Sequence, residues 1–361
     1  DMVRGYAITA LGDIGVAYPE HKREFIKFME KFDENPFRII LEDGEHLIGD
    51  GEPAFTVKIN KIPKMMDMLT STSITLGEAY MNGDIEIEGD LYTALNMFLG
   101  QMGKFSTDTK KLKNIIFTSK SKANQKKEVS SHYDIGNDFY KMWLDETMSY
   151  SCGYFKNEND TLYQAQCNKV DRILEKLNLS DGMTLCDIGC GWGFLLIEAA
   201  KKYNIKGVGI TLSREQKAKF EQRIKEENLS DRLEVKLLDY RDLPKQHMEF
   251  DRVVSVGMIE HVGRGNYEEF MQCVKSVLKQ GGVFVLHFIS ALKEYPGDAW
   301  VKKYIFPGGV IPSLREIMQI AGELRFYTVD VESLRRHYNK TLLCWNENFQ
   351  QHRAEVVEMF D

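Results

Sequence analysis

A strand that runs directly into a glycine-rich turn and then a helix constrains this chain more than any other feature. The segment spans residues 185–193 and reads LCDIGCGWG. Glycines at Gly189, Gly191 and Gly193 let the backbone approach a bound nucleotide-like ligand closely. Other tight strand-to-helix turns, including those of NAD-binding domains, share part of this pattern. The turn therefore predicts an α/β fold and leaves the ligand class open.

Two features of the turn argue against NAD. The glycines lack the third glycine at the later spacing of dinucleotide-binding turns. Asp187 precedes the first glycine at the end of the strand, where it favours a positively charged methionine moiety and disfavours a pyrophosphate. The spacing resembles motif I of class I methyltransferases, and so predicts binding of S-adenosylmethionine.

The apolar pattern from residue 183 onward alternates between strand and helix. Strands are predicted at residues 183–188, 205–211, 233–237, 252–256 and 282–289, and helices at 192–203, 213–228 and 266–278. Ser213 is the expected N-cap of the second helix, and the strand at 282–289 is apolar enough to be buried on both faces. Alternating units of this kind predict a doubly wound parallel sheet. We expect a Rossmann-like α/β catalytic domain at residues 131–361.

The first part of the chain has a different pattern. Short strands are expected at residues 37–41, 55–59 and 85–87, and helices at 65–69 and 91–99. Residues 1–103 are therefore predicted to form a small α+β domain for lipid docking or dimer contacts. A basic linker, residues 104–130, follows, with eight lysines between Lys104 and Lys127. It is either a solvated connection or a surface that touches anionic lipid headgroups.

Composition limits the remaining classes. At 361 residues the chain exceeds what one core usually organises, and its net charge of −7 argues mildly against nucleic acid as a partner. Six cysteines form no disulfide framework, which fits a reduced cytoplasmic protein. The spacing of Cys186 and Cys190 is wrong for a zinc pair, so no metal is expected. No apolar run reaches membrane-spanning length and no secretory signal is evident.

Most class I methyltransferases carry a carboxylate after the second strand that binds the ribose hydroxyls. This chain has none there, since residues 209–213 read GITLS. Polar groups after the second strand are expected to substitute for it, and groups after the third strand to flank the adenine. These predicted cofactor residues are Thr211, Leu212, Gln216, Asp239, Tyr240 and Arg241.

Further blocks make a family resemblance specific. They are HYDIGNDFY at 132–140, MSYSCGYF at 148–155, GVGITLS at 207–213, VSVGMIEHVG at 254–263, KYIFPGG at 303–309 and HYNKTL at 337–342. Together they resemble the cyclopropane-fatty-acyl-phospholipid synthase family, with the mycolic acid cyclopropane synthases as relatives. The resemblance covers nearly everything from residue 130 to 350.

This resemblance implies particular site residues. Tyr133, Tyr150 and Ser151 match positions that contact S-adenosylmethionine. The family's catalytic base is a bound bicarbonate, and the matching positions are Cys152, Glu260, His287, the backbone of Ile289, and Tyr338. Taken singly, each side chain has a structural alternative. Cys152 could be a small buried hydrophobe, His287 a core histidine, and Glu260 an ion-pair partner of Arg252 or Arg264.

The expected function follows from the same resemblance. A methylene is transferred from S-adenosylmethionine to the cis double bond of unsaturated acyl chains in membrane phospholipids. A carbocation forms, and bound bicarbonate removes the proton that closes a cyclopropane ring. We expect a homodimer on the inner face of the membrane, with residues 290–312 as a cover over the acyl channel. The alternatives are a methyltransferase that makes a methyl-branched lipid or acts on a small amine, and a lipid-binding protein with a degenerate domain.

Overall fold

The computed structural model describes residues 18–101 and 135–360, which fall into two compact units. Residues 18–101 belong to the first unit together with Asp298–Val301, and the other described residues belong to the second. The predicted domain limits at 103 and 131, the lysine-rich linker and Tyr133 lie outside the described residues.

The first unit is built on a four-stranded sheet with the order β2-β1-β3-β4. Its elements are α2 (Tyr18–Met29), β1 (Phe37–Leu41), β2 (Gly44–Ile48), β3 (Phe55–Ile59), α3 (Met65–Thr70), α4 (Thr72–Met81), β4 (Ile85–Gly89) and α5 (Leu91–Gln101). Strands β1 and β3 are parallel, and the two outer pairs are antiparallel. Alternate strand residues such as Phe37 and Ile39 are fully buried, because successive side chains of a strand point to opposite faces. The predicted α+β fold of this unit is confirmed.

The second unit contains a parallel five-stranded sheet with the order β7-β6-β5-β8-β9. The strands are β5 (Thr184–Ile188), β6 (Lys206–Thr211), β7 (Leu233–Leu237), β8 (Phe250–Val256) and β9 (Leu278–His287). Four of the five predicted strands agree with these bounds to within two residues. The doubly wound parallel sheet predicted from the alternation of strands and helices is confirmed.

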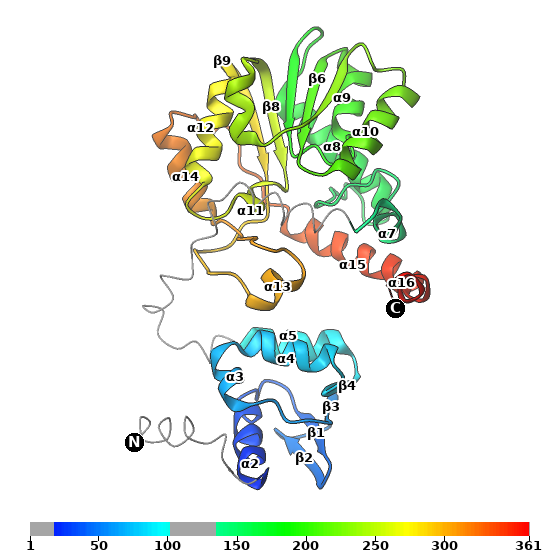
Figure 1. The fold of residues 1–361 in the computed structure, drawn as a ribbon, viewed down its shortest axis with the longest axis vertical. Coiled ribbons are helices and arrows are strands. Elements are labelled where there is room, and N and C mark those ends of the chain that lie inside the picture. Colours follow the sequence, from blue (N-terminus) through cyan, green and yellow to red (C-terminus); the bar gives the residue numbers. More distant parts are fainter. Residues whose placement is uncertain (1–17, 102–134, 361) are drawn as a thin grey trace. The chain divides into compact units, whose positions relative to one another are not determined.

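Helices cover both faces of this sheet (Figure 1). Helices α8 (Leu162–Leu177), α9 (Phe194–Tyr203) and α10 (Arg214–Glu226) pack on one face, and α12 (Tyr267–Val277) and α14 (Leu314–Glu323) pack on the other. On the central strand β5, Leu185 joins the first core, whereas Cys186 and Ile188 join the second. A strand that is apolar on both faces is what a sheet between two helical layers requires.

The structure differs from two expectations about this unit. Helix α9 begins at Phe194 and not at Trp192, because Gly193 adopts φ +86°, outside the helical region. Strand β9 is half-buried and not fully buried, because it lies at the edge of the sheet. Within the described residues β8 is its one paired neighbour.

The remaining helices lie outside the sheet and the helices that cover it. They are α7 (Asn137–Trp143), the 3₁₀ helix η3 (Tyr240–Gln246), α11 (Ile259–Val262), α13 (Ala299–Tyr304), α15 (Arg335–Gln351) and α16 (Arg353–Phe360). Helix α15 packs against α7. None of the helices within residues 18–101 and 135–360 is long and apolar enough to cross a membrane.

Candidate active site

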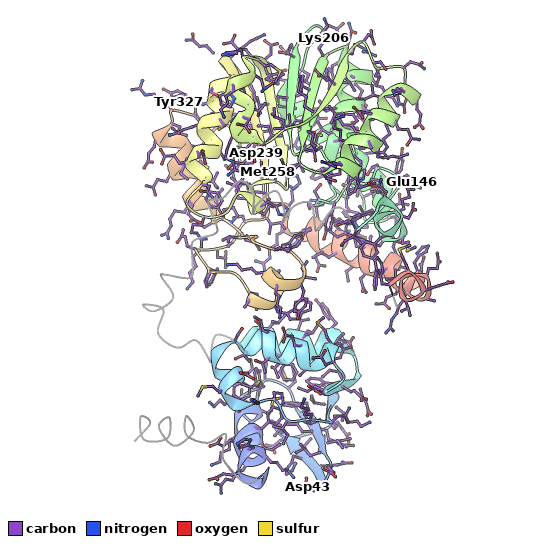
Figure 2. All side chains as sticks on the ribbon, in the orientation of Figure 1. Asp43, Glu146, Lys206, Asp239, Met258 and Tyr327 are labelled. Carbon is purple, nitrogen blue, oxygen red and sulfur yellow. The ribbon has the colours of Figure 1, made fainter. Side chains whose placement is uncertain are left out.

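A cavity of about 160 Å³ opens at the carboxyl ends of β5, β6 and β8. The chain leaves β5 toward β6 and leaves β8 toward β9, so the connections diverge between these two adjacent strands. Ligands of open α/β sheets bind at such a switch point. Figure 2 shows the cavity residues Asp239 and Met258 at this end of the sheet, whereas Lys206, which begins β6, lies at the other end.

The glycine-rich turn forms one wall of the cavity. Gly189, Gly191 and Gly193 have φ values of +84°, +53° and +86°, which side chains with a Cβ rarely adopt. The backbone N–H groups of Gly189 and Cys190 both donate to the carbonyl of Ile210, at 3.0 and 3.1 Å, and so fix the turn against β6. A Cβ on Gly193 would lie 2.0 Å from a ring carbon of Phe220. This glycine is therefore required by packing as well as by its backbone conformation.

Asp187 lies at the end of β5 and is 3% exposed. Its Oδ1 is buried and has no hydrogen-bond partner within the described ranges. Burial raises the pKa of this carboxyl to about 7, against the opposing influence of the Lys169 ammonium. An unsatisfied buried carboxylate is costly unless a ligand supplies the donor. The geometry therefore fits a cationic ligand group beside Asp187.

The polar groups after β6 and β7 also line the cavity. The Thr211 hydroxyl donates to Gln216 Oε1 at 2.7 Å, and the Ser213 side chain caps α10 as predicted. After β7, Asp239 accepts two hydrogen bonds from the Arg241 guanidinium, at 2.8 and 2.6 Å. These hydrogen bonds hold both pairs of side chains in place at the cavity edge.

A third wall comes from the segment that precedes α8. Tyr150 and Ser151 lie there, and the Gln166 amide of α8 donates to the Ser149 and Ser151 carbonyls at 3.3 and 3.0 Å. All twelve predicted cofactor residues within the described ranges line this one cavity: Tyr150, Ser151, Asp187, Gly189, Gly191, Gly193, Thr211, Leu212, Gln216, Asp239, Tyr240 and Arg241. Their individual roles remain predictions.

Glu260 and Ile289 meet directly, although 29 positions separate them in the chain. The Ile289 backbone N–H donates to Glu260 Oε1 at 2.8 Å, while Oε2 is buried without a partner among the described residues. Burial raises the pKa of Glu260 to about 7. The two ion pairs considered for Glu260 do not form. Arg264 pairs with Glu316, and Arg252 donates to backbone carbonyls.

Of the other residues predicted to hold bicarbonate, Cys152 is buried and His287 and Tyr338 are half-buried, and all three side chains are uncharged near neutral pH. Burial lowers the pKa of His287 to about 4 and raises that of the Cys152 thiol to about 11. Burial also raises the pKa of Tyr338, and the nearby Tyr150, Glu260 and Cys152 add to the rise. Cys152 and Glu260 do not line the cavity themselves, but each is next in the chain to a residue that does. These four side chains are therefore not among the described residues that line the cavity.

Aromatic rings surround Tyr150. The Trp143 ring contacts it edge-on with centroids 4.9 Å apart, Trp345 lies at 5.3 Å, and Phe306 stacks on it at 6.2 Å. The Tyr338 ring is 6.3 Å from that of Trp345. Ring faces attract cations and exclude water. Tyr150 lines the cavity, so this cluster presents an electron-rich aromatic ring to it.

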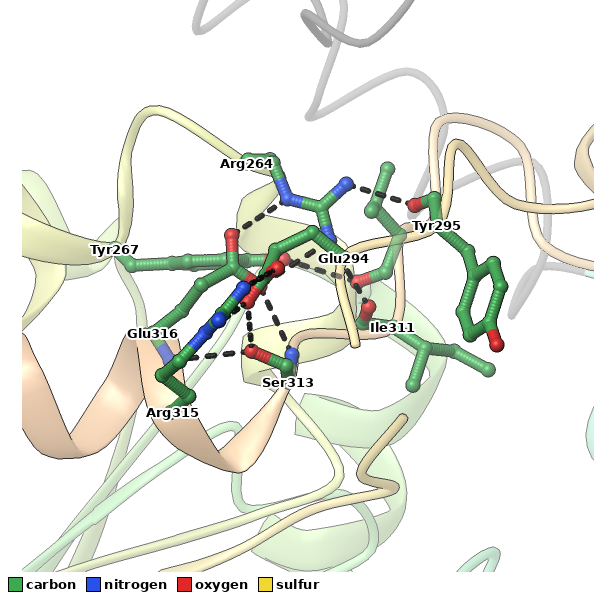
Figure 3. Close-up of polar contacts among 9 residues, drawn as sticks. Arg264, Tyr267, Glu294, Tyr295, Ile311, Ser313, Arg315 and Glu316 are labelled. Carbon is green, nitrogen blue, oxygen red and sulfur yellow. Dashed lines mark hydrogen bonds and ion pairs between the residues drawn. The ribbon is translucent and has the colours of Figure 1, made fainter. Parts of the chain in front are cut away.

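The Arg264 guanidinium binds two distant parts of the predicted cover, residues 290–312 (Figure 3). Arg264 donates to the carbonyls of Tyr295 at 2.7 Å and Ile311 at 3.5 Å. The same side chain binds Glu316 of α14 through two hydrogen bonds of 2.6 and 3.2 Å. Arg264 thereby links the chain at Tyr295 and at Ile311 to helix α14.

Sequence reasoning missed two polar residues of this site, Gln166 and Lys169. Both are buried on α8 and hold the segment that carries Ser151. They occupy inward positions of an otherwise apolar helix face. Polar residues at core positions of an amphipathic pattern are a signal that could have identified them.

Comparison with known proteins settles the family. Residues 120–361 match the family model of mycolic acid cyclopropane synthetase. The chain belongs to this family. A second family model, of a domain of unknown function, matches residues 25–110.

Relatives of the family extend over most of the chain. A probable fatty acid methyltransferase of Pseudomonas putida is 39% identical over 342 residues, which is 89% of this chain and 83% of the relative. The cyclopropane-fatty-acyl-phospholipid synthase of Escherichia coli K12 is 36% identical over 337 residues, or 91% and 86%. The crystal structure of mycolic acid cyclopropane synthase CmaA1 with SAH and CTAB superposes with a TM-score of 0.61 at 34% identity. It covers 65% of this chain and 86% of that one.

Family membership confirms three of the predictions. The chain is an S-adenosylmethionine-dependent methyltransferase, its catalytic unit has the class I fold, and it is of the cyclopropane synthase type. The cavity at the switch point of its sheet is the place where that fold holds its ligand.

Proposed function

We propose that this enzyme transfers a methylene from S-adenosylmethionine to the cis double bond of unsaturated acyl chains in membrane phospholipids, forming a cyclopropane ring. One observation carries the proposal. The half-buried Glu260 accepts from the Ile289 backbone, has a second oxygen without a partner among the described residues, and is next in the chain to His261 of the cavity lining. Tyr150, also in that lining, is surrounded by aromatic rings. Methyl transfer alone needs no such buried acid, whereas ring closure must also manage a proton.

The cavity residues fit the cofactor. S-Adenosylmethionine, when bound, supplies an electrophilic methyl group on a sulfonium. Asp187 has a free buried oxygen for a cationic group, and Asp239, Thr211 and Gln216 present polar groups after the next strands. The positive φ values of the glycine turn keep its backbone close to the ligand.

The aromatic cluster suits the acceptor. Attack by an alkene leaves a carbocation on the acyl chain, and water would quench it. Tyr150 lines the cavity and is packed against the rings of Phe306 and Trp345. Ring faces stabilise a cation by about 2 kcal/mol when desolvated. These rings would exclude water and favour the charged state.

We further propose that a bicarbonate ion is the base. It would be held by Cys152, Glu260, His287, Tyr338 and the backbone of Ile289. Because its pKa is raised to about 7, Glu260 is often protonated and can donate a hydrogen bond to an anion. Neutral His287 and the Tyr338 hydroxyl add donors without a competing negative charge.

The substrate class rests on the relatives. The E. coli relative is named for phospholipid acyl chains and the P. putida relative for fatty acids. A lipid substrate requires docking on a membrane, for which we propose the lysine-rich linker and the first unit, with that unit also a candidate for homodimer contacts. The segment 290–312 would then cover the acyl chain. Charge reversal of the linker lysines should release the enzyme from anionic vesicles, and unchanged binding would contradict this role.

A methyl-branched product is the second candidate, favoured by the name of the P. putida relative. Mass spectrometry of vesicles of a monounsaturated phospholipid, incubated with enzyme and S-adenosylmethionine, separates the two. A gain of CH₂ together with loss of the olefin, weaker when bicarbonate is removed, is the expected result. A branched product would support the second candidate. Lipids that stay unchanged while the cofactor binds would contradict both.

A further inference from the structure

Lys169 is a buried cation inside the cofactor cavity. It lies on α8, is 4% exposed and lines the cavity. Its ammonium donates to the Ser151 hydroxyl at 2.8 Å, and within the described residues this is its one hydrogen-bond acceptor. An ammonium has three N–H donors. A buried cation with unused donors is costly, so the site is built for a further acceptor.

The two carboxylates near Lys169, Asp145 and Asp187, differ in their hydrogen bonding. Asp145 is occupied, because it accepts hydrogen bonds from the Thr147 backbone and hydroxyl at 3.1 and 2.8 Å. Asp187 has a buried oxygen without a partner in the described part of the chain. No ion pair joins Lys169 to either carboxylate there, although both influence its charge. A buried positive and a buried negative group thus line one cavity, and each has hydrogen-bonding capacity that no described residue uses.

We propose that Lys169 binds the α-carboxylate of the cofactor's methionine moiety while Asp187 binds its α-ammonium. An α-amino acid carries these two opposite charges on one carbon, so a matched pair recognises it as a unit. Ser151, which already accepts from Lys169, would share the carboxylate. This inference deepens the cofactor assignment on which the proposed function rests, and it adds a binding residue to it.

Bicarbonate is a second anion that Lys169 could bind, since the charge of this ammonium lowers the pKa of both Cys152 and His287. The cavity decides between the two sources. Lys169 and Ser151 line the cofactor cavity, whereas Cys152 and His287 do not. The cofactor carboxylate is therefore the ligand that reaches Lys169.

Calorimetric binding of four ligands tests this without a lipid substrate. They are S-adenosylhomocysteine, its decarboxylated and deaminated analogues, and methylthioadenosine, which lacks both groups. Lys169→Met should weaken the two carboxylate-bearing ligands about ten- to hundredfold and leave the other two unchanged. Asp187→Asn should instead weaken the two amine-bearing ligands. Lys176→Met, on the same helix but outside the cavity, is the matched control and should change none.

A wild-type measurement covers the case in which Lys169→Met does not fold. At about pH 8.5, Lys169 is partly neutral because burial lowers its pKa to about 8. Asp187 is then ionised and His287 neutral, and Cys152 stays a thiol because burial raises its pKa to about 11. Burial also raises the pKa of the nearby Cys167 thiol and Asp145 carboxyl. The deaminated ligand has no amine to titrate, so its binding should take up a proton. Buffers of different ionisation enthalpy measure that uptake.

Three results would overturn the inference. They are an equal loss for all four ligands, no loss at all, and no proton uptake by the wild type. If Lys169→Met left the affinity for S-adenosylhomocysteine unchanged but removed the response of the enzyme to bicarbonate, Lys169 would be assigned to the bicarbonate site instead. Because these assays need no acyl substrate, the inference can stand even if the lipid reaction fails, and can fail while that reaction stands.

Discussion

Replacing Glu260 by Gln should stabilise the protein above neutral pH while removing a group that we propose takes part in the reaction. The glutamine keeps the shape and the acceptor for the Ile289 backbone N–H but cannot ionise. Burial lifts the pKa of Glu260 from its ordinary 4.5 to about 7 in the folded chain. Between these values the folded state binds a proton that the unfolded state does not. The free energy of unfolding therefore falls as the pH rises from about 4.5 to about 7.

The size of the effect follows from the shift. Each pKa unit corresponds to about 1.4 kcal/mol, so full burial of the charge costs about 3 kcal/mol. The residue as a whole is half-buried, and we expect Glu260→Gln to add about 1 to 3 kcal/mol to the free energy of unfolding at pH 8. At pH 4 the difference from wild type should vanish, because Glu260 is then protonated in both states.

Urea unfolding of both proteins at the two pH values measures this difference. Glu158→Gln, at an exposed loop position, is the control and should show no pH-dependent gain. A variant that is equally stable relative to wild type at both pH values would refute the reasoning, because the gain would then not come from the buried charge.

Three further changes test other parts of the site. Gly193→Ala places a Cβ 2.0 Å from the Phe220 ring at positive φ and should cost about 3 kcal/mol in urea unfolding. Gly182→Ala, at positive φ with open space around the new Cβ, should cost only about 1 to 2 kcal/mol. Equal losses of stability in the two alanine variants would contradict the packing argument. Arg264→Lys should speed amide exchange across residues 290–312, because a lysine cannot make the two-pronged contact with Glu316. Arg172→Lys should leave this exchange unchanged. Slow exchange in both variants would mean that the Arg264 guanidinium does not hold residues 290–312 in place. Tyr338→Phe should lower turnover about a hundredfold without changing S-adenosylhomocysteine affinity, whereas Tyr327→Phe, which is 93% exposed, should change neither. Full turnover by Tyr338→Phe would remove Tyr338 from the site.

Local patterns were enough to predict the catalytic fold. The glycine turn and the alternation of strands and helices depend on neighbours in the chain, and strands such as β7 (Leu233–Leu237) match their predicted bounds. The cofactor cavity was predictable for the same reason, because carboxyl ends of parallel strands meet at one edge. The resemblance of separate blocks then predicted the family.

Contacts between distant segments were less accessible from the sequence. Whether Glu260 would bind Arg252, Arg264 or the Ile289 backbone depends on how α11 and the end of β9 come together. The burial of Lys169 in the cavity lining was not predicted, because a lysine on an amphipathic helix normally faces solvent. The edge position of β9 was missed because an apolar run does not reveal how many strands will pair with it.

Labelled methyl transfer tests the central claim most directly. S-Adenosylmethionine with a trideuterated methyl group and a monounsaturated phospholipid would be incubated with the enzyme, and the product examined by mass spectrometry and proton NMR. Ring closure must remove one deuteron from the new methyl, so the account predicts a product that retains two deuterium atoms and shows a cyclopropane signal. A product that retains all three deuterium atoms, or a new alkene in place of the ring, would contradict it.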